Sequence, residues 1–252
     1  MKPHPEQRKV DPKAWRRRSA FSFTAFILLL ACAVFVFRWI KQQPRVDGAP
    51  RPLRAALNAN EKVFGSYFDT SRQARTYPLT AAVRKVRVNG NDGLRTQLDT
   101  AAWRLQVVRS AGDTLRITMD EIRALPKKDI VFDFKCIEGW SQVTHWAGVP
   151  LKTFLERYGL KAEEGYKYMG LVTPDGGYYV GIDMPSALHP QTLLCYEMNG
   201  KPLPLNQGYP LRLIIPVKYG VKHLKRIGTM SFSNQKPPDY WAERGYDYYT
   251  GH

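Results

Sequence analysis

Cysteine is scarce in this chain, and its spacing argues against a cysteine-rich metal site. The 252 residues include only Cys32, Cys136 and Cys195, and no CxxC or HxxxH spacing accompanies them. A zinc site built from the two later cysteines and nearby histidines therefore has little support. Haem-binding and flavin motifs, internal repeats and low-complexity segments are also missing. With 44% hydrophobic residues, the chain is long enough to bury a real core and is expected to be globular.

Charge is absent from one long stretch near the N-terminus. Residues 20–37 read AFSFTAFILLLACAVFVF, and extending the stretch to residue 40 adds only Arg38. A helix of roughly 20 residues crosses the ~30 Å hydrocarbon core of a bilayer. We therefore expect a transmembrane helix over residues 19–40, after a basic arm over residues 1–18. A cleaved signal peptide usually has a shorter apolar region. A lipoprotein site at Cys32 is a further alternative, although the chain stays apolar beyond it.

Basic residues flank this stretch unequally, seven before it and five after it. Because Lys/Arg-rich flanks stay cytoplasmic, this asymmetry favours a single pass through a bacterial cytoplasmic (inner) membrane with the large C-terminal part on the periplasmic side. The run Arg16–Arg18 also permits a variant twin-arginine export signal. Residues 1–56 carry a net +9 of the total +16. Since the excess lies beside the apolar stretch, it indicates membrane topology and not nucleic-acid binding.

The remainder of the chain predicts a short linker and one domain. Residues 41–55 contain three prolines and no apolar periodicity, as in a linker. Residues 56–252 mix short strands with a few helical turns, which predicts a β-rich domain of the α+β class. Helices are expected over residues 119–125 and 150–158. Strands are expected over residues 86–88, 103–108, 114–118, 129–136, 168–173, 178–182, 193–198, 211–217 and 226–232.

Cys136 stands where one of these strands ends. Ile130, Phe132, Phe134 and Cys136 alternate with more polar residues, so a strand of period two would carry the thiol on a buried face. Glu138-Gly139-Trp140 then breaks the alternation, which places Cys136 at the start of a loop, a position where scaffolds present reactive groups. A structural cysteine, or a disulfide between Cys136 and Cys195, is the alternative.

Four segments around this cysteine resemble a known family. In order along the chain, the segments read FKCIEGWS, HWAGVPL, HPQTLLCYEMNGKPLP and PLRLIIPVKYGVKHLKRI. Together they resemble the molybdopterin-binding domain of the sulfite oxidase family and, within it, the catalytic subunits of bacterial periplasmic methionine sulfoxide reductases. The resemblance is strong over residues 129–227 and weaker over residues 58–128. It implies a sulfite-oxidase-like fold and a molybdenum–molybdopterin cofactor.

The resemblance also implies which residues form the site. Cys136 matches the cysteine that binds molybdenum, and a thiolate suits a soft metal environment. Arg212 and Lys225 match residues on the side of the cofactor that bears its phosphate, where charge-assisted hydrogen bonds are strong. Asn206-Gln207-Gly208 replaces the family's Gln-Asn-Gly, so its asparagine contact falls on Gln207 or shifts to Asn206. The remaining implied cofactor contacts are Thr173, His223 and Leu224, and near the domain start Asn60, Val63 and Phe64, where the match could slide to Asn58.

The implied function is oxygen-atom transfer by a membrane-anchored oxidoreductase. Reduction of sulfoxides, such as free or protein-bound methionine sulfoxide, is the expected reaction. Sulfite oxidases proper carry extra arginines just after the metal cysteine, and their absence from Ile137–Trp140 disfavours an anionic substrate. Electrons would come from a separate partner, a membrane cytochrome or a cytochrome c. The alternative is a membrane-tethered domain that keeps the fold and binds a ligand without catalysis.

Overall fold

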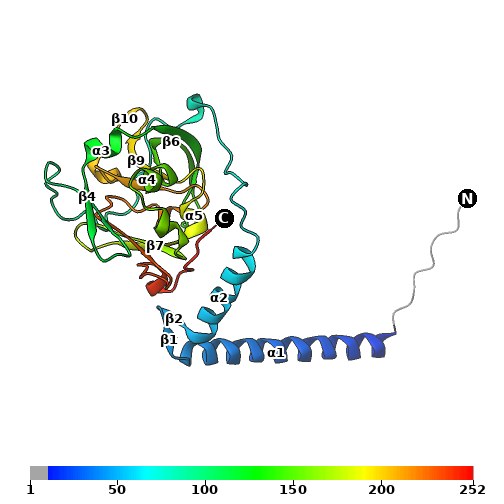
Figure 1. The fold of residues 1–252 in the computed structure, drawn as a ribbon. Helices are drawn as coiled ribbons and strands as arrows, with labels where there is room; N and C mark the ends of the chain where they lie inside the picture. The colour runs from blue at the N-terminus through cyan, green and yellow to red at the C-terminus, as the bar shows by residue number, and fades with distance from the viewer. Residues whose placement is uncertain (1–10, 252) are drawn as a thin grey trace, which may run out of the picture.

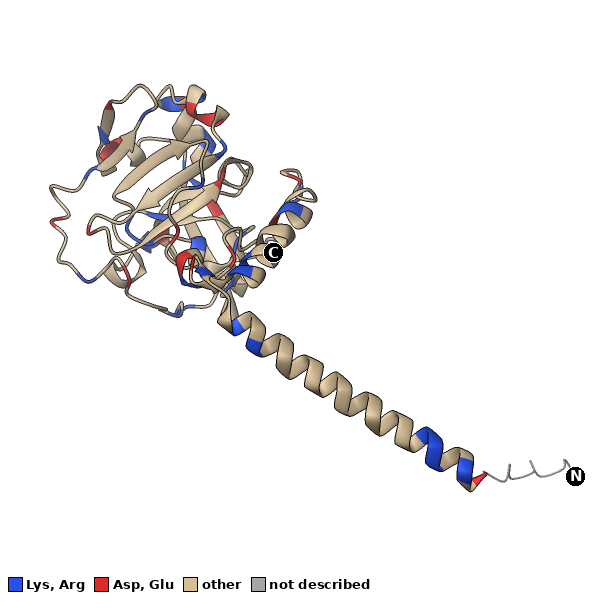
Figure 2. Ribbon diagram, turned by 90° about the horizontal axis from the view of Figure 1, so that it is seen from below, with Lys and Arg blue, Asp and Glu red and all other residues tan. Residues whose placement is uncertain are grey.

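The computed structural model describes residues 11–251, so most of the expected basic arm lies outside the described residues. Asp11 caps the N-terminus of helix α1 (Pro12–Gln42), because its side chain accepts a hydrogen bond from the backbone N–H of Lys13 at 3.0 Å. The helix includes the apolar stretch, has an 18-residue window of mean hydropathy 2.6 and buries none of its residues. Within residues 11–251 it is the one helix long and apolar enough to cross a membrane. Basic residues lie near both of its ends (Figure 2).

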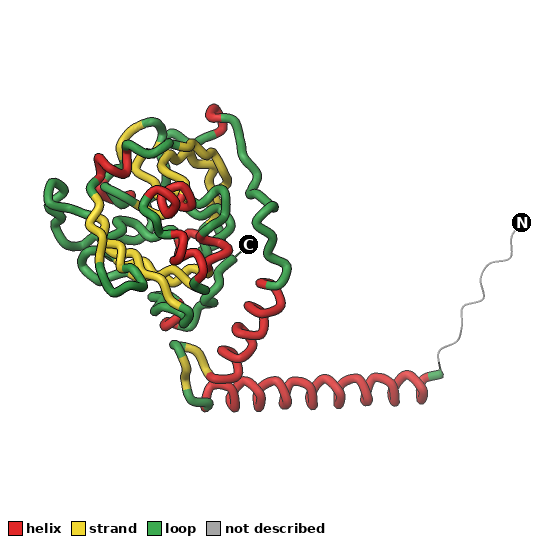
Figure 3. Tube along the Cα trace, in the orientation of Figure 1, coloured by secondary structure: helices red, strands yellow, loops and turns green. Residues whose placement is uncertain are grey.

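The segment after α1 is more structured than the linker that its composition predicted. Strands β1 (Arg45–Val46) and β2 (Ala49–Pro50) form a small antiparallel hairpin, and helix α2 (Arg51–Gly65) follows directly. Figure 1 shows α2 rising at an angle from the end of α1 towards the domain. The chain then runs along the domain mostly as loop, up to about residue 104 (Figure 3). The strand expected over residues 86–88 is irregular, because no neighbouring strand pairs with it.

Two five-stranded sheets form the body of the domain. In the first, β10 (Lys201–Pro202), β9 (Leu193–Met198), β6 (Ser141–Pro150) and β5 (Lys128–Lys135) lie in this order, and β11 (Arg212–Ile214) also pairs with β9. In the second the order is β4 (Thr114–Ile117), β3 (Leu105–Val108), β12 (Thr229–Ser233), β7 (Tyr168–Val172) and β8 (Tyr179–Asp183). Among the strands of residues 11–251, only β3 and β12 pair in parallel. The α+β class predicted from the sequence is therefore confirmed.

Three short helices complete the domain: α3 (Met119–Arg123), α4 (Leu151–Arg157) and α5 (Met184–Ala187). The two expected helices correspond to α3 and α4. Thr118 and Glu121 form a capping box at the start of α3, which satisfies backbone N–H groups there. The apolar face of α4, with Phe154 and Leu155 fully buried, packs into the larger hydrophobic core. A second core cluster, which includes Phe132 and Trp146, lies in the first sheet.

Candidate active site

Cys136 lies in the loop that joins β5 to β6. The two strands pair along the whole length of β5, from Lys128 opposite Gly148 to Lys135 opposite Ser141. The loop closes through a 2.9 Å hydrogen bond from the N–H of Cys136 to the carbonyl of Trp140 and a 3.0 Å bond from the N–H of Gly139 to the carbonyl of Cys136. Gly139 has φ +86°, which explains a glycine there. The rigid hairpin thus holds the thiol, only 6% exposed, in a fixed place.

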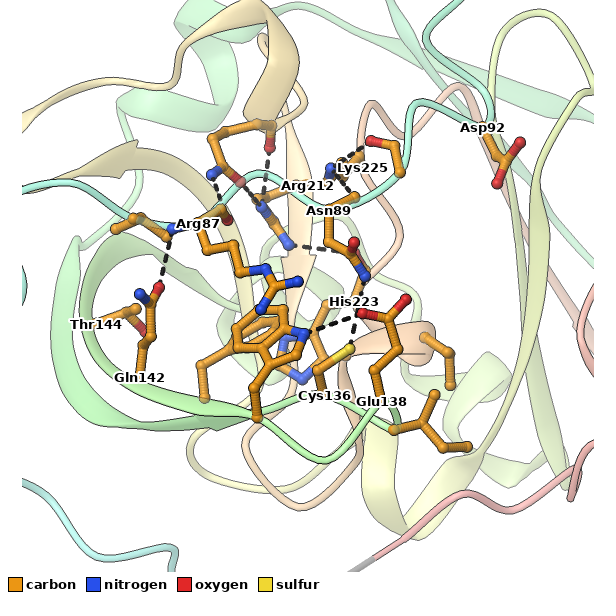
Figure 4. Close-up of a pocket in the computed structure, with 18 of the residues that line it drawn as sticks. Arg87, Asn89, Asp92, Cys136, Glu138, Gln142, Thr144, Arg212, His223 and Lys225 are labelled. Atoms are coloured by element: carbon orange, nitrogen blue, oxygen red, sulfur yellow. Dashed lines mark hydrogen bonds between the residues drawn. The ribbon is translucent and has the colours of Figure 1, made fainter.

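A pocket surrounds this thiol, with about 970 Å³ of space not filled by protein atoms, part of it open to solvent. Figure 4 shows side chains from several loops and strands converging on Cys136. Of the sequence-predicted residues, Gln207, Arg212, His223 and Lys225 line this pocket together with Cys136. The structure therefore brings five predicted residues into one cavity, although they are separated by up to 89 positions.

Arg212 is the most buried charge of the pocket. Its Nη1 donates to the carbonyl and the side-chain oxygen of Gln207, at 3.0 and 2.9 Å, and its Nη2 donates to the carbonyl of His223 at 3.4 Å. The guanidinium stacks 4.5 Å from the ring centre of Trp146. Its Nε is buried and has no hydrogen-bond partner. Burial lowers the pKa of Arg212 to about 10, which still leaves it charged at neutral pH.

Lys225 supplies a second cation. Its Nζ donates to the carbonyls of Asn89 and Gly90, at 2.6 and 3.1 Å. Burial, and then repulsion by Arg212, lower the pKa of Lys225 to about 8, partly offset by Asp92. Within residues 11–251 neither Lys225 nor Arg212 forms an ion pair with a carboxylate. Two neighbouring cations that no carboxylate pairs with directly suit a bound anion.

His223 forms part of the inner wall and is fixed by two backbone groups. Its Nε2 lies 3.1 Å from the carbonyl of Lys218, and its Nδ1 lies 3.4 Å from the backbone N–H of Ile215. An acceptor on one side and a donor on the other require the proton on Nε2. The ring also packs edge-on against Phe134 with ring centres 4.7 Å apart. The imidazole is thus neutral, rigid and held at the back of the cavity.

Three predicted residues close to the pocket behave differently. The hydroxyl of Thr173 serves a turn, donating to Asp175 at 2.6 Å and accepting from the N–H of Tyr178 at 3.1 Å. Leu224 is fully buried in the larger core and does not line the pocket. Of the alternatives at residues 206 and 207, Gln207 is buried against Arg212, whereas Asn206 is exposed. Gln207 also donates to the carbonyl of Arg87 at 3.2 Å.

The structure places the three residues predicted near the domain start elsewhere. Asn60, Val63 and Phe64 lie on α2, and the side chains of Val63 and Phe64 are 53% and 63% exposed. Asn60 and Phe64 line a different groove, between α2 and the C-terminal residues. These residues belong to a helix and not to a loop beside the pocket, so none of them lines the cavity around Cys136. Asn58, the alternative position, is also exposed on α2.

The loop over residues 86–92 lines the pocket around Cys136, where Asn60, Val63 and Phe64 had been expected. The sequence analysis did not assign this loop to the site. The side-chain nitrogen of Asn89 lies 3.7 Å from the sulfur of Cys136. The guanidinium of Arg87 lies 4.7 Å from the ring centre of Trp140. From the C-terminal side, Trp241 and Tyr246 line the pocket as well. No short motif marks these residues; the only available signal was the predicted strand over 86–88, which leads directly to Asn89.

Glu138 balances the positive charge of Arg87 at the mouth of the pocket. Its carboxylate accepts from the indole N–H of Trp140 at 3.1 Å. Hydrogen bonds from Asn89 and Trp140, and then the charge of Arg87, lower the pKa of Glu138, so it stays ionised. The sequence predicted no arginine next to Cys136 in Ile137–Trp140. Arg87 nevertheless reaches the pocket from the loop over residues 86–92, and the carboxylate of Glu138 offsets its charge.

The other two cysteines take no part in the pocket. All three cysteines are free, so Cys136 and Cys195 do not form the alternative disulfide. Cys195 pairs with Arg212 in the register of β9 and β11, and burial raises its pKa to about 12. Among the described residues, no group of three or more His, Cys, Asp or Glu side chains could hold a metal ion by themselves. Cys136 is therefore the one thiol that lines the pocket shared with Arg212 and Lys225 in the described part of the chain.

These features suit a domain that binds a molybdopterin group better than a domain that keeps the fold without a cofactor. Such a group needs one thiolate near its metal and cations near its phosphate, and Cys136, Arg212 and Lys225 all line this pocket. The unpartnered Nε of Arg212 is the buried donor that a phosphate or pterin oxygen would satisfy.

Comparisons with known proteins agree with a molybdopterin-binding domain. The family described as "Oxidoreductase molybdopterin binding domain" matches residues 93–241. YedZ1 of Azospira oryzae, named as a candidate protein-methionine-sulfoxide reductase subunit, is 39% identical over 227 residues, covering 89% of this chain and 82% of that protein. The protein-methionine-sulfoxide reductase catalytic subunit MsrP of Xanthomonas axonopodis pv. citri is 31% identical over 162 residues, covering 58% of this chain and 49% of its own. This chain thus spans about half the length of that relative.

A solved structure shows a similar fold. The sulfane dehydrogenase SoxCD from Paracoccus pantotrophus superposes with a TM-score of 0.50 over 56% of this chain and 40% of that chain. The sequence identity of 19% limits this likeness to the fold. Together with the paired sheets, it confirms the sulfite-oxidase-like architecture expected from the sequence.

Proposed function

The chain belongs to the oxidoreductase molybdopterin-binding domain family, within the sulfite oxidase family, and on that premise we propose that it reduces sulfoxides, including methionine sulfoxide, while anchored to a bacterial inner membrane. It is a molybdopterin-dependent oxidoreductase, and its relatives include methionine sulfoxide reductase subunits. The observation that carries the proposal is the position of Cys136 at the tip of the β5–β6 hairpin, inside the same pocket as the cation pair Arg212 and Lys225.

We assign each pocket residue a part in holding the cofactor. When bound, the molybdenum–pterin group supplies the two-electron chemistry of oxygen-atom transfer. The thiolate of Cys136 would bind the metal. Arg212 and Lys225 would bind the phosphate, with Gln207 orienting the guanidinium through its 2.9 Å hydrogen bond. His223, with both ring nitrogens satisfied by the backbone, would support the cofactor as a rigid neutral wall and not as a proton donor.

The mouth of the pocket favours a neutral, polarisable substrate. Trp140, Trp241, Tyr246 and Ile137 give it an apolar lining, and aromatic rings attract the sulfur of thioether-like groups. The charges of Arg87 and Glu138 offset each other beside it, which leaves a donor for a sulfoxide oxygen without a net positive field. A sulfoxide matches this arrangement, whereas sulfite would meet the carboxylate of Glu138.

The proposed chain has four parts. A cytoplasmic arm over residues 1–18 would lead into a membrane span over residues 19–40. A connecting segment over residues 41–55 would then join the span to a periplasmic catalytic domain over residues 56–252. Support comes from the composition of α1, with basic residues at both ends and no buried side chain. No haem-binding or flavin motif is present in the sequence, so electrons would reach Cys136 and its metal from a membrane cytochrome or a soluble cytochrome c.

Molybdenum content and sulfoxide reduction test this function. The full chain would be purified in detergent from a host that makes the cofactor, with Cys136→Ser beside it and Cys195→Ala as the matched control, because Cys195 is buried outside the pocket. We expect near-stoichiometric molybdenum, visible thiolate charge-transfer absorption and dye-linked reduction of methionine sulfoxide in the wild type and the control. Cys136→Ser should lose the absorption and the activity. A folded, colourless wild type without molybdenum would favour the non-catalytic binding domain instead.

A further inference from the structure

Arg54 is the one residue of α2 that the fold buries, at 5% exposure. Its guanidinium donates to the carbonyls of Asp47 at 2.5 Å and of Val46 at 3.5 Å, both in the β1–β2 hairpin. It also donates to the carbonyls of Ala242 at 2.6 Å and Tyr246 at 3.0 Å, about 190 positions away along the chain. A buried arginine that joins two distant backbone segments fixes their relative position.

The same two segments also meet backbone to backbone. Gly48, at the turn of the hairpin, has φ +73°, and a Cβ built on it would lie 2.4 Å from the carbonyl oxygen of Glu243 and 2.5 Å from the nitrogen of Gly245. Only glycine allows this approach. The hairpin that follows α1 therefore sits directly on residues 243–245, and Arg54 fastens it there.

Residues 241–246 carry the aromatic wall of the active-site pocket. Trp241 and Tyr246 both line the cavity around Cys136, and their rings meet edge to face with centres 5.1 Å apart. Arg54 holds the carbonyl of Tyr246 itself and the carbonyl of Ala242, which adjoins Trp241. The N–H of Tyr246 in turn donates to the carbonyl of Trp241 at 3.1 Å. The position of the wall is thus set from α2.

We propose that Trp241 and Tyr246 form the surface against which the methylsulfinyl group of the substrate packs, and that Arg54 is the positioning residue of this surface. The inference rests on the proposed function and adds a part of the site that precedes the family match at residue 93. Aromatic rings supply large, rigid contact area for sulfur-bearing groups. Because Arg54 acts on substrate binding and not on the cofactor, its loss changes KM and spares the metal.

The test uses the molybdenum-loaded full chain in detergent. The variants are Arg54→Ala, the conservative Arg54→Lys, and Arg51→Ala as a matched control, since Arg51 is exposed on the same helix. Dye-linked kinetics with N-acetylmethionine sulfoxide give KM and kcat. We expect Arg54→Ala to raise KM at least tenfold, to keep kcat within threefold of the wild type and to leave the molybdenum content unchanged. Arg54→Lys should have a KM between those of Arg54→Ala and the wild type. Arg51→Ala should match the wild type.

A second measurement does not depend on activity. Hydrogen–deuterium exchange reports on the backbone N–H groups of Gly245 and Tyr246, which donate to the carbonyls of Ala242 and Trp241. Faster exchange of residues 241–246 in Arg54→Ala, and not in Arg51→Ala, supports the positioning role. Unchanged exchange or unchanged KM overturns it, as does a loss of molybdenum in step with kcat, which would mean a general structural role. A wild type that binds molybdenum but reduces no sulfoxide contradicts the proposed function instead.

Discussion

The side-chain amide of Asn89 donates to the sulfur of Cys136, with a nitrogen–sulfur distance of 3.7 Å. The contact joins the loop over residues 86–92 to the tip of the β5–β6 hairpin (Figure 4). A hydrogen bond to a thiolate withdraws electron density from the sulfur, and groups next to metal ligands tune the metal in this way. Asn89 is therefore placed to adjust the properties of the proposed ligand.

Replacing Asn89 by Ala should leave the metal bound and change its properties. We expect the thiolate charge-transfer band to move and sulfoxide reduction to fall by about 10- to 100-fold, the usual effect of losing a partner of a metal ligand. Asn91→Ala is the control, because Asn91 is exposed in the same loop. Visible absorption and dye-linked kinetics of both variants provide the test. Identical spectra for the two would show that Asn89 does not act on Cys136.

Arg212→Met should separate folding from cofactor binding. The side chain is buried and its Nε has no partner, so it is costly in the absence of an anion. Methionine removes that cost but leaves Gln207 and His223 without its hydrogen bonds, so we expect the free energy of unfolding to change by less than about 2 kcal/mol. Molybdenum content should fall at least tenfold. Arg226→Met, a buried arginine outside the pocket, should keep the metal. Equal molybdenum in both would contradict the phosphate role.

The sequence identified the residues that the sheets bring together. Cys136 follows the expected strand β5 and Arg212 lies at the start of β11, so both belong to the first sheet and reach the same pocket. The expected alternation was wrong in its detail, because Ile130, Val131 and Phe132 are all buried. Their positions follow from local patterns, since hairpins and strands are set by neighbouring residues. The cofactor and the roles of these residues came from the family resemblance, because strand periodicity and turn motifs carry no information about a cofactor.

Contacts made by irregular segments could not be predicted in this way. Asn89 and Trp241 reach the pocket from loops whose path depends on packing against distant backbone, such as Gly48 against residues 243–245. Asn60 was expected in the site because the weaker part of the family resemblance placed it there, but that segment continues as helix α2 and keeps it outside. Helix periodicity there was hidden by the prolines at residues 50 and 52, which begin the helix rather than prevent it.

Cofactor retention should weaken as the pH rises through about 8. The pKa of Lys225 is lowered from 10.5 to about 8 by burial and by Arg212. In the cofactor-free fold Lys225 therefore loses its proton above that pH, whereas a bound phosphate would keep it charged, so binding requires proton uptake there. We expect molybdenum retained after dialysis to fall between pH 7 and 9 in the wild type. Lys225→Arg should remove this dependence, and Lys225→Gln should bind weakly at every pH. A flat wild-type profile would refute the assignment.

Asp239→Asn should destabilise the whole domain by loosening its C-terminal segment. The carboxylate lies 2.5 Å from Nζ of Lys222, and both side chains are almost fully buried. It also accepts from the N–H groups of Gly181 and Ala242, at 3.1 and 3.0 Å. Breaking a buried pair leaves an uncompensated charge, which costs about 3–5 kcal/mol. Urea unfolding should show this loss, whereas Asp113→Asn, in an exposed pair with Arg109, should leave the midpoint nearly unchanged. Equal midpoints would mean that the pair contributes nothing to the attachment of the pocket wall.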